Sequence, residues 1–429
     1  MQTLLDAIAA DEFDPNSMPV DKARAFIGGL MQAVAETETL PLADALYRVL
    51  AADVLSPCDV PPHRNSGMDG YALSHAHFAP QRQYTVAATS FAGTPLPSDF
   101  TLQLDECIRI FTGAVVPECC DVVIMQERAQ TTGELVTFDG NANQHQNIRN
   151  AGEDLKAGEI TLVRGRQLRA AELGLLASLG LSHVTVLRKL RVAFFSSGDE
   201  LVAAGTRLQA GQIYDSNSTT IAAMLARLGA TGINMGSVQD DPALLETALI
   251  YAANNADVVI SSGGVSVGEA DFIKGLLNKI GEVVFWKIAM KPGRPLAYGK
   301  IRRTTHTGKN AGNAHFFGLP GNPVSTMVTF YQIVRPSLMA LQGINPTPFQ
   351  PTFQVECVTP IKKATGRTEF QRGVLFTEKG VTKVRTTGAQ GSGILKSLSD
   401  ANCFIILGDD VGNVAAGAMV DVQVLEGMV

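Results

Sequence analysis

Between about residue 190 and residue 343, buried-strand patterns alternate with amphipathic helical patterns, and this alternation restricts the fold more than any other feature. Short apolar runs predict the strands, and apolar residues at helical spacing predict the helices. This alternation of strands and helices favours a parallel sheet covered by helices on both faces. The predicted elements are LRVAFFSS, STTIAAMLARLG, TGINMGSVQ, DPALLETALIYAANN, ADVVISS, ADFIKGLLNKIG, VVFWKIA, PLAYGK, HFFGLP and a helix from Pro323 to about Leu341.

The flanking sequence has a different character. Short strand-like runs between glycine and proline turns predict an inserted β-rich domain, whereas the segments around it have helical spacing, with two helices broken at Pro41. The C-terminal part again predicts short strands. We therefore expect a multidomain α/β protein with a helical region (1–52 and 150–188), an inserted β-rich domain (53–149), a central doubly wound parallel sheet (189–343) and a C-terminal β-barrel (344–429).

Amino-acid composition and charge restrict the kinds of molecule that the protein is expected to bind. The 429 residues carry a formal net charge of −6, which argues against general binding to nucleic acids or to anionic membranes. The six cysteines show no regular spacing, which favours free thiols over disulfides or a zinc site. The N-terminus MQTLLDAIAADEFD lacks a basic leader, and no apolar run reaches the ~18 residues that would span a membrane. We expect a soluble, cytoplasmic protein.

Polar residues follow several predicted strands of the central sheet. Ligands of open parallel sheets bind beyond the carboxyl ends of the strands, so these residues are candidates for a site. Turns and helix caps are the alternative for single members, and Asp241 before Pro242 is better explained as an N-cap. The candidates are Asp199 and Glu200 after FFSS, Asp240 after GSVQ, and Ser262, Gly263, Gly264, Ser266 and Gly268 followed by Glu269 and Asp271.

Two further segments supply anion-binding groups. In LPGNPVS, Asn322 and Pro323 suit the start of a helix whose free N–H groups bind anions, although a purely structural helix start is the alternative. The segment KIAMKPGRP supplies cations, unless it is a solvated basic turn. We expect Pro320, Gly321, Asn322, Pro323 and Ser325, together with Lys287, Lys291 and Arg294, at the same rim.

The carboxylates beside the glycine-rich loop raise an electrostatic problem. Glu269 and Asp271 would repel a phosphate unless a divalent cation bridges them, and oxygen ligands favour magnesium. Helix capping alone explains one of the two acids. The hypothesis is a phosphate site bridged by Mg²⁺.

Together these segments resemble the MoeA family, the molybdopterin molybdenumtransferases, whose eukaryotic relative is the E domain of gephyrin. The resemblance covers nearly the whole chain in order. It rests on NSGMDGYAL, FTGAVVP, QNIRNAGED, SSGDEL, GQIYDSN, SSGGVSVGEADF, KPGRP, LPGNPVS, FQRG and TTGAQGSG. The family implies that adenylylated molybdopterin and molybdate react, with a divalent cation, to give molybdenum cofactor and AMP.

The resemblance also implies roles for individual residues. It implies an elongated homodimer whose cleft joins the central domain of one chain to the β-rich domain of the other, with the helical region as linker and dimerisation element. It leaves open a partner among other molybdenum-cofactor synthesis proteins. The matching positions are Asp69, Thr112, Arg149 and Asp154 in the β-rich domain, Glu200, Asp240, Asp271, Lys287, Lys291, Pro320 and Pro323 in the central domain, and Arg372 and Ser392 in the C-terminal domain, with Glu200, Asp240 and Asp271 as metal ligands.

Two departures and two rival functions accompany the resemblance. His63 stands where the family more commonly has an aromatic residue, and we expect it to pack. Residues 302–314 predict an exposed, polar excursion between two strands. The central domain also resembles the Mog-type adenylyltransferase, which lacks the flanking domains. A catalytically silent scaffold is the second rival, but it would not require the acids and lysines at the rim.

Overall fold

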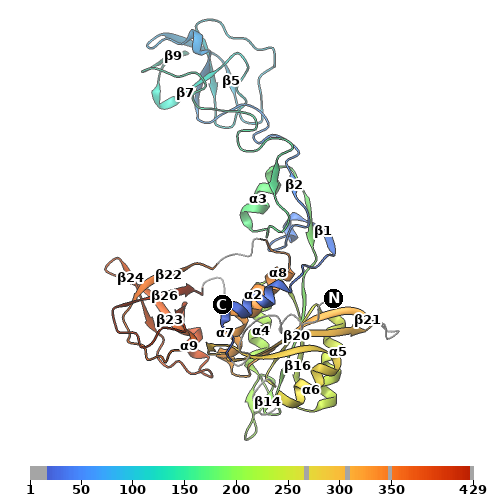
Figure 1. Ribbon diagram of the computed structural model, residues 1–429. Coiled ribbons are helices and arrows are strands. Elements are labelled where there is room, and N and C mark those ends of the chain that lie inside the picture. The colour runs from blue at the N-terminus through green and yellow to red at the C-terminus, as the bar shows by residue number, and fades with distance from the viewer. Residues whose placement is uncertain (1–16, 265–269, 305–309, 346–349, 426–429) are drawn as a thin grey trace.

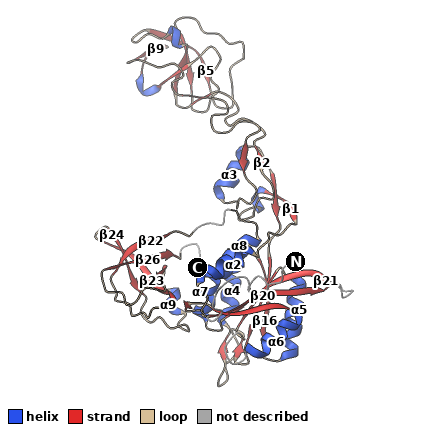
Figure 2. Cartoon of the chain, in the orientation of Figure 1, coloured by secondary structure: helices blue, strands red, loops and turns tan. Residues whose placement is uncertain are grey.

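The computed structural model describes residues 17–264, 270–304, 310–345 and 350–425, and it has an extended shape. A β-rich domain lies at the end of a narrow stalk, away from an α/β domain and a C-terminal barrel that lie beside each other (Figures 1 and 2). Among the described residues, no helix is both long and apolar enough to cross a membrane. All six cysteines are free thiols, as predicted.

The stalk is made by segments from both sides of the β-rich insertion. β1 pairs antiparallel with β12, and β2 pairs antiparallel with β11, so the chain leaves and returns along the same path. The elements are α2 (Val20–Gly29), β1 (Thr37–Pro41), the 3₁₀ turn η1 (Leu42–Asp44), β2 (Val54–Leu55), β11 (Ile160–Leu162), α3 (Ala170–Ser178) and β12 (His183–Leu187). α2 itself buries Ala23 and Ile27 in the core of the α/β domain.

The prediction of a second N-terminal helix from helical spacing is wrong. After α2 the chain forms β1 and η1, and then isolated bridges from Val49 to Gln167 and from Leu50 to Val186. Leu50 is buried against residues of the returning segment, while Leu46 is 47% exposed. Pairing with a distant strand therefore overrides the local spacing.

The β-rich domain contains a six-stranded sheet in the order β7-β4-β6-β5-β9-β8. Residues alternate between its two faces: Tyr71 and Leu73 belong to one core cluster, and Ala72 belongs to the other. The elements are β3 (Asn65–Ser66), β4 (Gly70–Leu73), η2 (His75–His77), β5 (Gln83–Ser90), β6 (Glu106–Ile110), β7 (Val122–Met125), η3 (Gln126–Arg128), β8 (Ala129–Thr132), β9 (Leu135–Phe138) and β10 (Ile148–Arg149).

The α/β domain has a six-stranded sheet in the order β16-β13-β17-β21-β20-β18. Val192 and Phe194 of β13 are buried on one face and Ala193 and Phe195 on the other, as expected for a sheet covered on both sides. The elements are β13 (Arg191–Ser197), β14 (Leu201–Val202), β15 (Ile213–Tyr214), α4 (Ser216–Arg227), β16 (Thr231–Val238), α5 (Pro242–Asn255), β17 (Val258–Ser262), α6 (Ala270–Ile280), β18 (Gly281–Lys287), β20 (Pro295–Thr304), β21 (Asn310–Leu319), α7 (Pro323–Thr329), the π-helical turn η4 (Phe330–Val334) and α8 (Arg335–Leu341).

Two details of this domain differ from the sequence prediction. β16, β13, β17 and β21 are parallel, but β20 runs antiparallel to both β21 and β18, so the sheet is mixed at that edge. Most of the segment 302–314 continues these strands as a hairpin, with Arg302 opposite Asn313 and Thr304 opposite Asn310. Residues 305–309 lie outside the described chain.

The C-terminal domain is a closed five-stranded barrel, as predicted. Its strands close in the order β23-β24-β22-β26-β25 and back to β23. The elements are β22 (Thr352–Cys357), β23 (Thr368–Glu378), β24 (Val381–Thr386), α9 (Lys396–Ser399), β25 (Cys403–Leu407) and β26 (Ala418–Val424). β19 (Met290–Lys291), from the α/β domain, adds to the end of β23 and sets Lys291 opposite Glu369. This pairing fixes the barrel beside the carboxyl ends of the parallel strands.

Candidate active site

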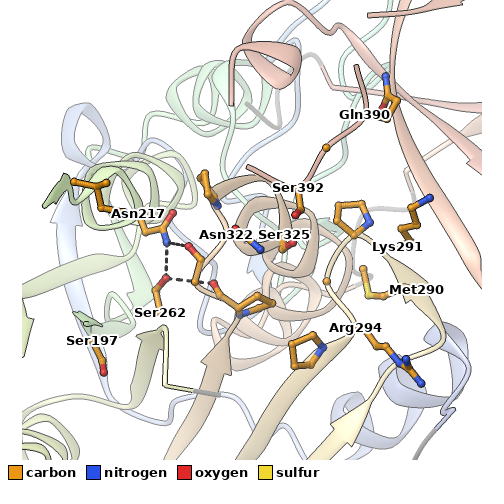
Figure 3. A pocket seen from close by; sticks show the side chains of 18 of the residues that line it. Ser197, Asn217, Ser262, Met290, Lys291, Arg294, Asn322, Ser325, Gln390 and Ser392 are labelled. Atoms are coloured by element: carbon orange, nitrogen blue, oxygen red, sulfur yellow. Dashed lines mark hydrogen bonds between the residues drawn. The ribbon is translucent and has the colours of Figure 1, made fainter. Parts of the chain in front are cut away.

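A cavity of 570 Å³ lies at the carboxyl ends of the parallel strands, against the barrel. Its polar residues come from the ends of β13 and β17, the start of α4, the turn after β19, the start of α7 and a loop of the barrel (Figure 3). The charged side chains lining it are Lys291, Arg294, Arg367 and Glu200. Within the part of the chain that the structure describes, cations therefore outnumber acids in this cavity. It suits an anionic ligand.

The glycine-rich loop after β17 approaches the neighbouring strand very closely. Gly263 has φ +95°, and a Cβ there would lie 2.4 Å from the carbonyl oxygen of Ser197. Only glycine tolerates both conditions. Ser262 lines the cavity, and Gly264 is buried. Ser266, Gly268 and Glu269 lie outside the described residues.

Asn217, which sequence reasoning did not single out, joins the two loops of the site. Its Nδ2 donates to Ser262 Oγ and to the carbonyl oxygen of Gly321, each at 2.7 Å (Figure 3). Since a carbonyl only accepts, this contact defines which end of the amide is the nitrogen. The side chain is 8% exposed, and its Oδ1 is buried without a partner among the described residues. Only its place in GQIYDSN marked it in the sequence.

The LPGN turn begins α7 as predicted, but its N–H groups are partly used. Asn322 occupies the N-cap position without a side-chain capping bond, and Pro323 takes the first helical position. The N–H of Val324 donates to the carbonyl oxygen of Ser392 at 3.1 Å. A barrel loop therefore takes one of the donors that we had assigned to an anion. Pro320, Gly321, Asn322, Pro323, Ser325 and Ser392 all line the cavity.

The predicted cations lie in different environments. Lys291 Nζ contacts Glu369 Oε1 at 3.1 Å, and the Glu369 side chain is 5% exposed. Arg294 is exposed at the cavity, and Arg367 of the barrel adds a cation that sequence reasoning missed. Lys287 ends β18 outside the lining of the cavity. The lysine turn is therefore tethered to the barrel through Glu369, the residue just before the family-like segment FQRG.

The predicted acids gather at the ends of β13 and β16. Ser197 Oγ donates to Asp240 Oδ1, and the N–H of Asp240 donates to Asp199 Oδ1 at 3.3 Å. Glu200 lines the cavity, and its carboxylate lies over Gly198, where a Cβ would come within 2.7 Å of Oε2. Asp241 accepts bonds from Ala243 N and Leu244 N at the start of α5, which confirms the N-cap interpretation.

The acids supply the oxygen ligands that Mg²⁺ prefers, but the described part does not complete a site. No group of three or more His, Cys, Asp or Glu residues arranged to hold a metal is found among the described residues. Asp271 lies in the first turn of α6, and its side chain is not described. Glu200, which lines the cavity, and Asp240, which does not, carry oxygen donors of the kind that Mg²⁺ prefers, and the third predicted ligand lies outside the described side chains.

Arg372 is placed behind the cavity instead of in it. It is 1% exposed, its Nε donates to Ser397 Oγ at 3.0 Å, and its Nη2 donates to the carbonyl oxygen of Gly391 at 3.1 Å. Burial lowers the pKa of its guanidinium to about 10. The predicted substrate contact is replaced by support of the loop that carries Gln390 and Ser392, two residues that do line the cavity.

Other predicted residues belong to the β-rich domain and its junction with the stalk, and the stalk holds that domain away from the α/β domain (Figure 1). Asp69 Oδ1 accepts the N–H and the hydroxyl of Thr112, both at 2.8 Å. The Thr112 N–H first, and then its hydroxyl, lower the pKa of Asp69. Arg149 and Glu153 form a pair at 3.8 Å, and Asp154 is exposed. None of these residues lines the cavity of the same chain.

His63 does not pack as expected: it is exposed. Arg109, which sequence reasoning did not single out, lies beside Asp69, with its guanidinium 5.0 Å from the ring centre of Tyr71 and 4.7 Å from that of Phe111. Its Nη1 donates to the carbonyl oxygen of Gly70. This arginine orders the backbone next to Asp69.

Comparisons with known proteins cover most of the chain. Residues 18–180 match the family model "MoeA N-terminal region (domain I and II)", residues 193–340 match "Probable molybdopterin binding domain", and residues 354–425 match "MoeA C-terminal region (domain IV)".

Individual relatives match over similar lengths. The chain is 43% identical to a molybdopterin molybdenumtransferase of Haemophilus influenzae over 408 residues, which is 95% of this chain and 98% of that protein. It is 33% identical to gephyrin of Dictyostelium discoideum, over 94% of this chain and 62% of that protein. A crystal structure of the molybdopterin biosynthesis moeA protein of Pyrococcus horikoshii OT3 matches 95% of this chain and 100% of its own, with 26% identity and a TM-score of 0.79.

Proposed function

The chain belongs to the MoeA family, and we propose that this molybdopterin molybdenumtransferase inserts molybdenum from molybdate into adenylylated molybdopterin, releasing AMP in a magnesium-dependent reaction. Its place is in molybdenum cofactor biosynthesis. The observation that carries the finer proposal is the cavity at the strand ends, which Lys291, Arg294 and Arg367 line together with Gly321. Both proposed substrates are anions, and this cavity suits them.

The chain's own residues have separable tasks in this proposal. Arg294 and Arg367 attract the oxygens of molybdate and of the phosphoanhydride. Lys291 adds a charge whose position Glu369 fixes. Gly321 lets the backbone at the start of α7 approach the substrate, and the serines that line the cavity orient it through hydrogen bonds. An oxygen of water or of molybdate forms a bond to the pterin-side phosphorus as the anhydride P–O bond breaks. Negative charge grows on the departing AMP oxygen, and fixed cations stabilise that charge.

Magnesium belongs to the proposal through the acids. Glu200, Asp240 and Asp271 would hold the ion, which supplies positive charge that polarises the phosphoanhydride. Asp240 is already oriented by Ser197 Oγ. Replacing Asp271 by Asn is expected to weaken magnesium-dependent AMP release far more than it lowers Tm. Equal loss of activity and folding would contradict the metal role.

The second half of the site is proposed to come from a partner subunit. Asp69 and Thr112 sit in a domain that the stalk carries away from the cavity of their own chain. A homodimer would bring Asp69, Thr112, Arg149 and Asp154 of the partner to the cavity and close it over the substrate. We also expect a cytoplasmic protein that works on small molecules.

The test is AMP release from adenylylated molybdopterin, measured with and without molybdate and Mg²⁺. Release that needs both ions supports the proposal. Lys291→Ala should abolish it, while Lys362→Ala, an exposed lysine of the barrel domain, should not. Consumption of ATP with molybdopterin would instead favour the Mog-type adenylyltransferase. No release by the folded protein would favour the scaffold.

A further inference from the structure

A second cavity, of 320 Å³, lies where the stalk meets the α/β domain, and it shares no lining residue with the candidate active site. Its volume is within the usual range for small-ligand sites. Tyr47 and Gln167 line it from the stalk, and Arg227 lines it from the end of α4. The remaining lining residues are Met224, Leu228, Phe330, Tyr331, Arg335, Met339 and Ile344.

Arg335, at the start of α8, carries a charge without a counterion. Its guanidinium makes no hydrogen bond or ion pair with any residue that the structure describes. Burial lowers the pKa of Arg335, the nearby charge of Arg227 lowers it further, and Tyr331 acts in the opposite direction. A partly buried cation without an acceptor is unfavourable, and a bound anion would relieve it.

Tyr331 supplies an independent sign of a missing ligand. The residue is 5% exposed, and its hydroxyl is buried without a hydrogen-bond partner among the described residues. Buried tyrosine hydroxyls usually have a partner. Burial raises the pKa of Tyr331 to about 12, so the phenol remains a neutral donor at physiological pH.

The polar lining of the cavity is rich in donors. Arg227, Tyr331 and Arg335 all donate, and no carboxylate occurs among the described lining residues. The rest of the lining is apolar, and there Phe330 and Met339 offer contact area to an aromatic or aliphatic group. Cationic donors next to an apolar wall suit a ligand with an acidic head and an apolar body.

We propose that this cavity binds a small organic anion, with its carboxylate or phosphate between the Arg335 guanidinium and the Tyr331 hydroxyl and its apolar part against Phe330 and Met339. Arg227 adds positive charge at the exposed side. The site is separate from the proposed transferase reaction, so either can hold without the other.

Calorimetric titration of the full chain with phenyl phosphate tests the proposal. We expect one equivalent to bind through this cavity, also in the Lys291→Ala background, where the other cavity has lost a cation. Arg335→Gln should weaken binding roughly 10-fold or more and Tyr331→Phe a few-fold, because each removes one donor to the anion. Arg207→Gln, which removes an exposed arginine elsewhere, should change nothing. Equal affinity of wild type and Arg335→Gln would overturn the site.

Two further measurements identify the class of ligand and the role of Arg335. Inorganic phosphate should bind at least about 10-fold more weakly than phenyl phosphate because it buries no apolar surface, and equal binding would overturn the assignment to an organic anion. Phenyl phosphate should raise the Tm of wild type and not of Arg335→Gln.

Without ligand, Arg335→Gln should keep the wild-type sedimentation and should not lower the Tm, since an unfavourable buried charge is removed and no described contact of the guanidinium is lost. A lower Tm, or a changed oligomer, would overturn the proposal in favour of a structural contact or a second copy of the chain. AMP release should stay unchanged in this variant.

Discussion

The cavity of the α/β domain and the Asp69 group of the β-rich domain differ in how their polar side chains are held. In the cavity, contacts cross between distant elements: Asn217 joins two loops, and Lys291 reaches a buried acid of the barrel. Around Asp69, among the described residues, the carboxylate accepts hydrogen bonds from Thr112 alone, at the surface of one domain. Both groups depend on contacts between residues far apart in the sequence, but the first joins the α/β domain to the barrel, whereas the second lies within one domain.

This difference suggests a division of work. A cavity with interlocked walls can bind an anion without help, because its donors are already oriented. A surface carboxylate held by one threonine becomes useful only when another surface approaches it. In the proposed composite site, the α/β domain is the half that binds the anion, and the β-rich domain is the half that a partner subunit supplies.

The largest expected effect comes from combining variants of the two regions. Asp69→Ala and Lys291→Ala should each reduce molybdate-dependent AMP release about 100-fold or more, because each removes a charge proposed to contact substrate. If the site is composite, mixing the two variants should restore about a quarter of wild-type activity, since half of randomly formed dimers contain one intact site. The measurement is AMP release after subunit exchange.

Asp99→Ala, an exposed acid of the same domain, serves as the control. Because Lys291→Ala leaves the buried Glu369 without its cation, Tm is recorded for every variant. Failure of the mixture to recover activity would break the proposed link between the two regions.

Asn217→Ala should affect the interlocked region next most strongly. It removes both bonds that join Ser262 to the carbonyl oxygen of Gly321, so kcat/KM for adenylylated molybdopterin should fall roughly 10- to 100-fold. Asn278→Ala, at an exposed position of α6, is the matched control. A variant with normal kcat/KM would mean that the bridge between the loops does not position substrate.

The stalk between the two regions has its own pH-sensitive contact. Glu172 of α3 is 3% exposed and accepts hydrogen bonds from Arg169 and Arg166, and these lower its pKa to about 2, with Arg169 the larger cause. A lowered carboxyl pKa stabilises the fold above the unfolded value of 4.5, and the gain is lost as the pH falls towards 2.

Glu172→Gln should therefore lower the free energy of unfolding by roughly 2 kcal/mol at pH 7, after allowing for the exposure of both arginines. Urea unfolding of wild type and variant between pH 7 and pH 2 measures this difference, which should shrink below pH 4.5. A difference in unfolding free energy that does not depend on pH would contradict the assignment of this pKa to Glu172. Binding of phenyl phosphate in the cavity beside Arg335 should not change in this variant.

The smallest expected effect concerns the hydrogen bond between the Thr112 hydroxyl and Asp69. Thr112→Val keeps the N–H bond to Asp69 and removes the hydroxyl bond, so the pKa of Asp69 should rise. Asp69 would then lose its charge at a higher pH, and the acid limb of the activity profile should move upwards with only a few-fold loss near neutral pH. Thr101→Val, also exposed, should leave the profile in place. An unchanged acid limb would show that Asp69 does not titrate in the reaction.

Much of the architecture could be predicted from local patterns. The alternation of Val192, Phe194 and their neighbours indicates a sheet buried on both faces, and the repeated short strands after Pro346 indicate the barrel. The pattern failed at residues 37–50, where apolar spacing suited a helix but the chain pairs with a strand that returns after the β-rich domain. The free energy gained from that pairing depends on residues of β12, far along the chain, so residues 37–50 alone do not predict it.

Within the site, the sequence by itself determined which chemical groups are available: glycines in turns that a side chain would obstruct, acids after strands, and a lysine in a turn after a short strand. These follow from residue type and local spacing. Only the tertiary structure decided their partners. Lys291 meets Glu369 across 78 residues, Asn217 meets Gly321 across 104, and Arg372 turns inwards to support a loop. Such contacts depend on how strands and domains pack, and the free energy of that packing is distributed over pairs of residues that no single stretch of sequence contains.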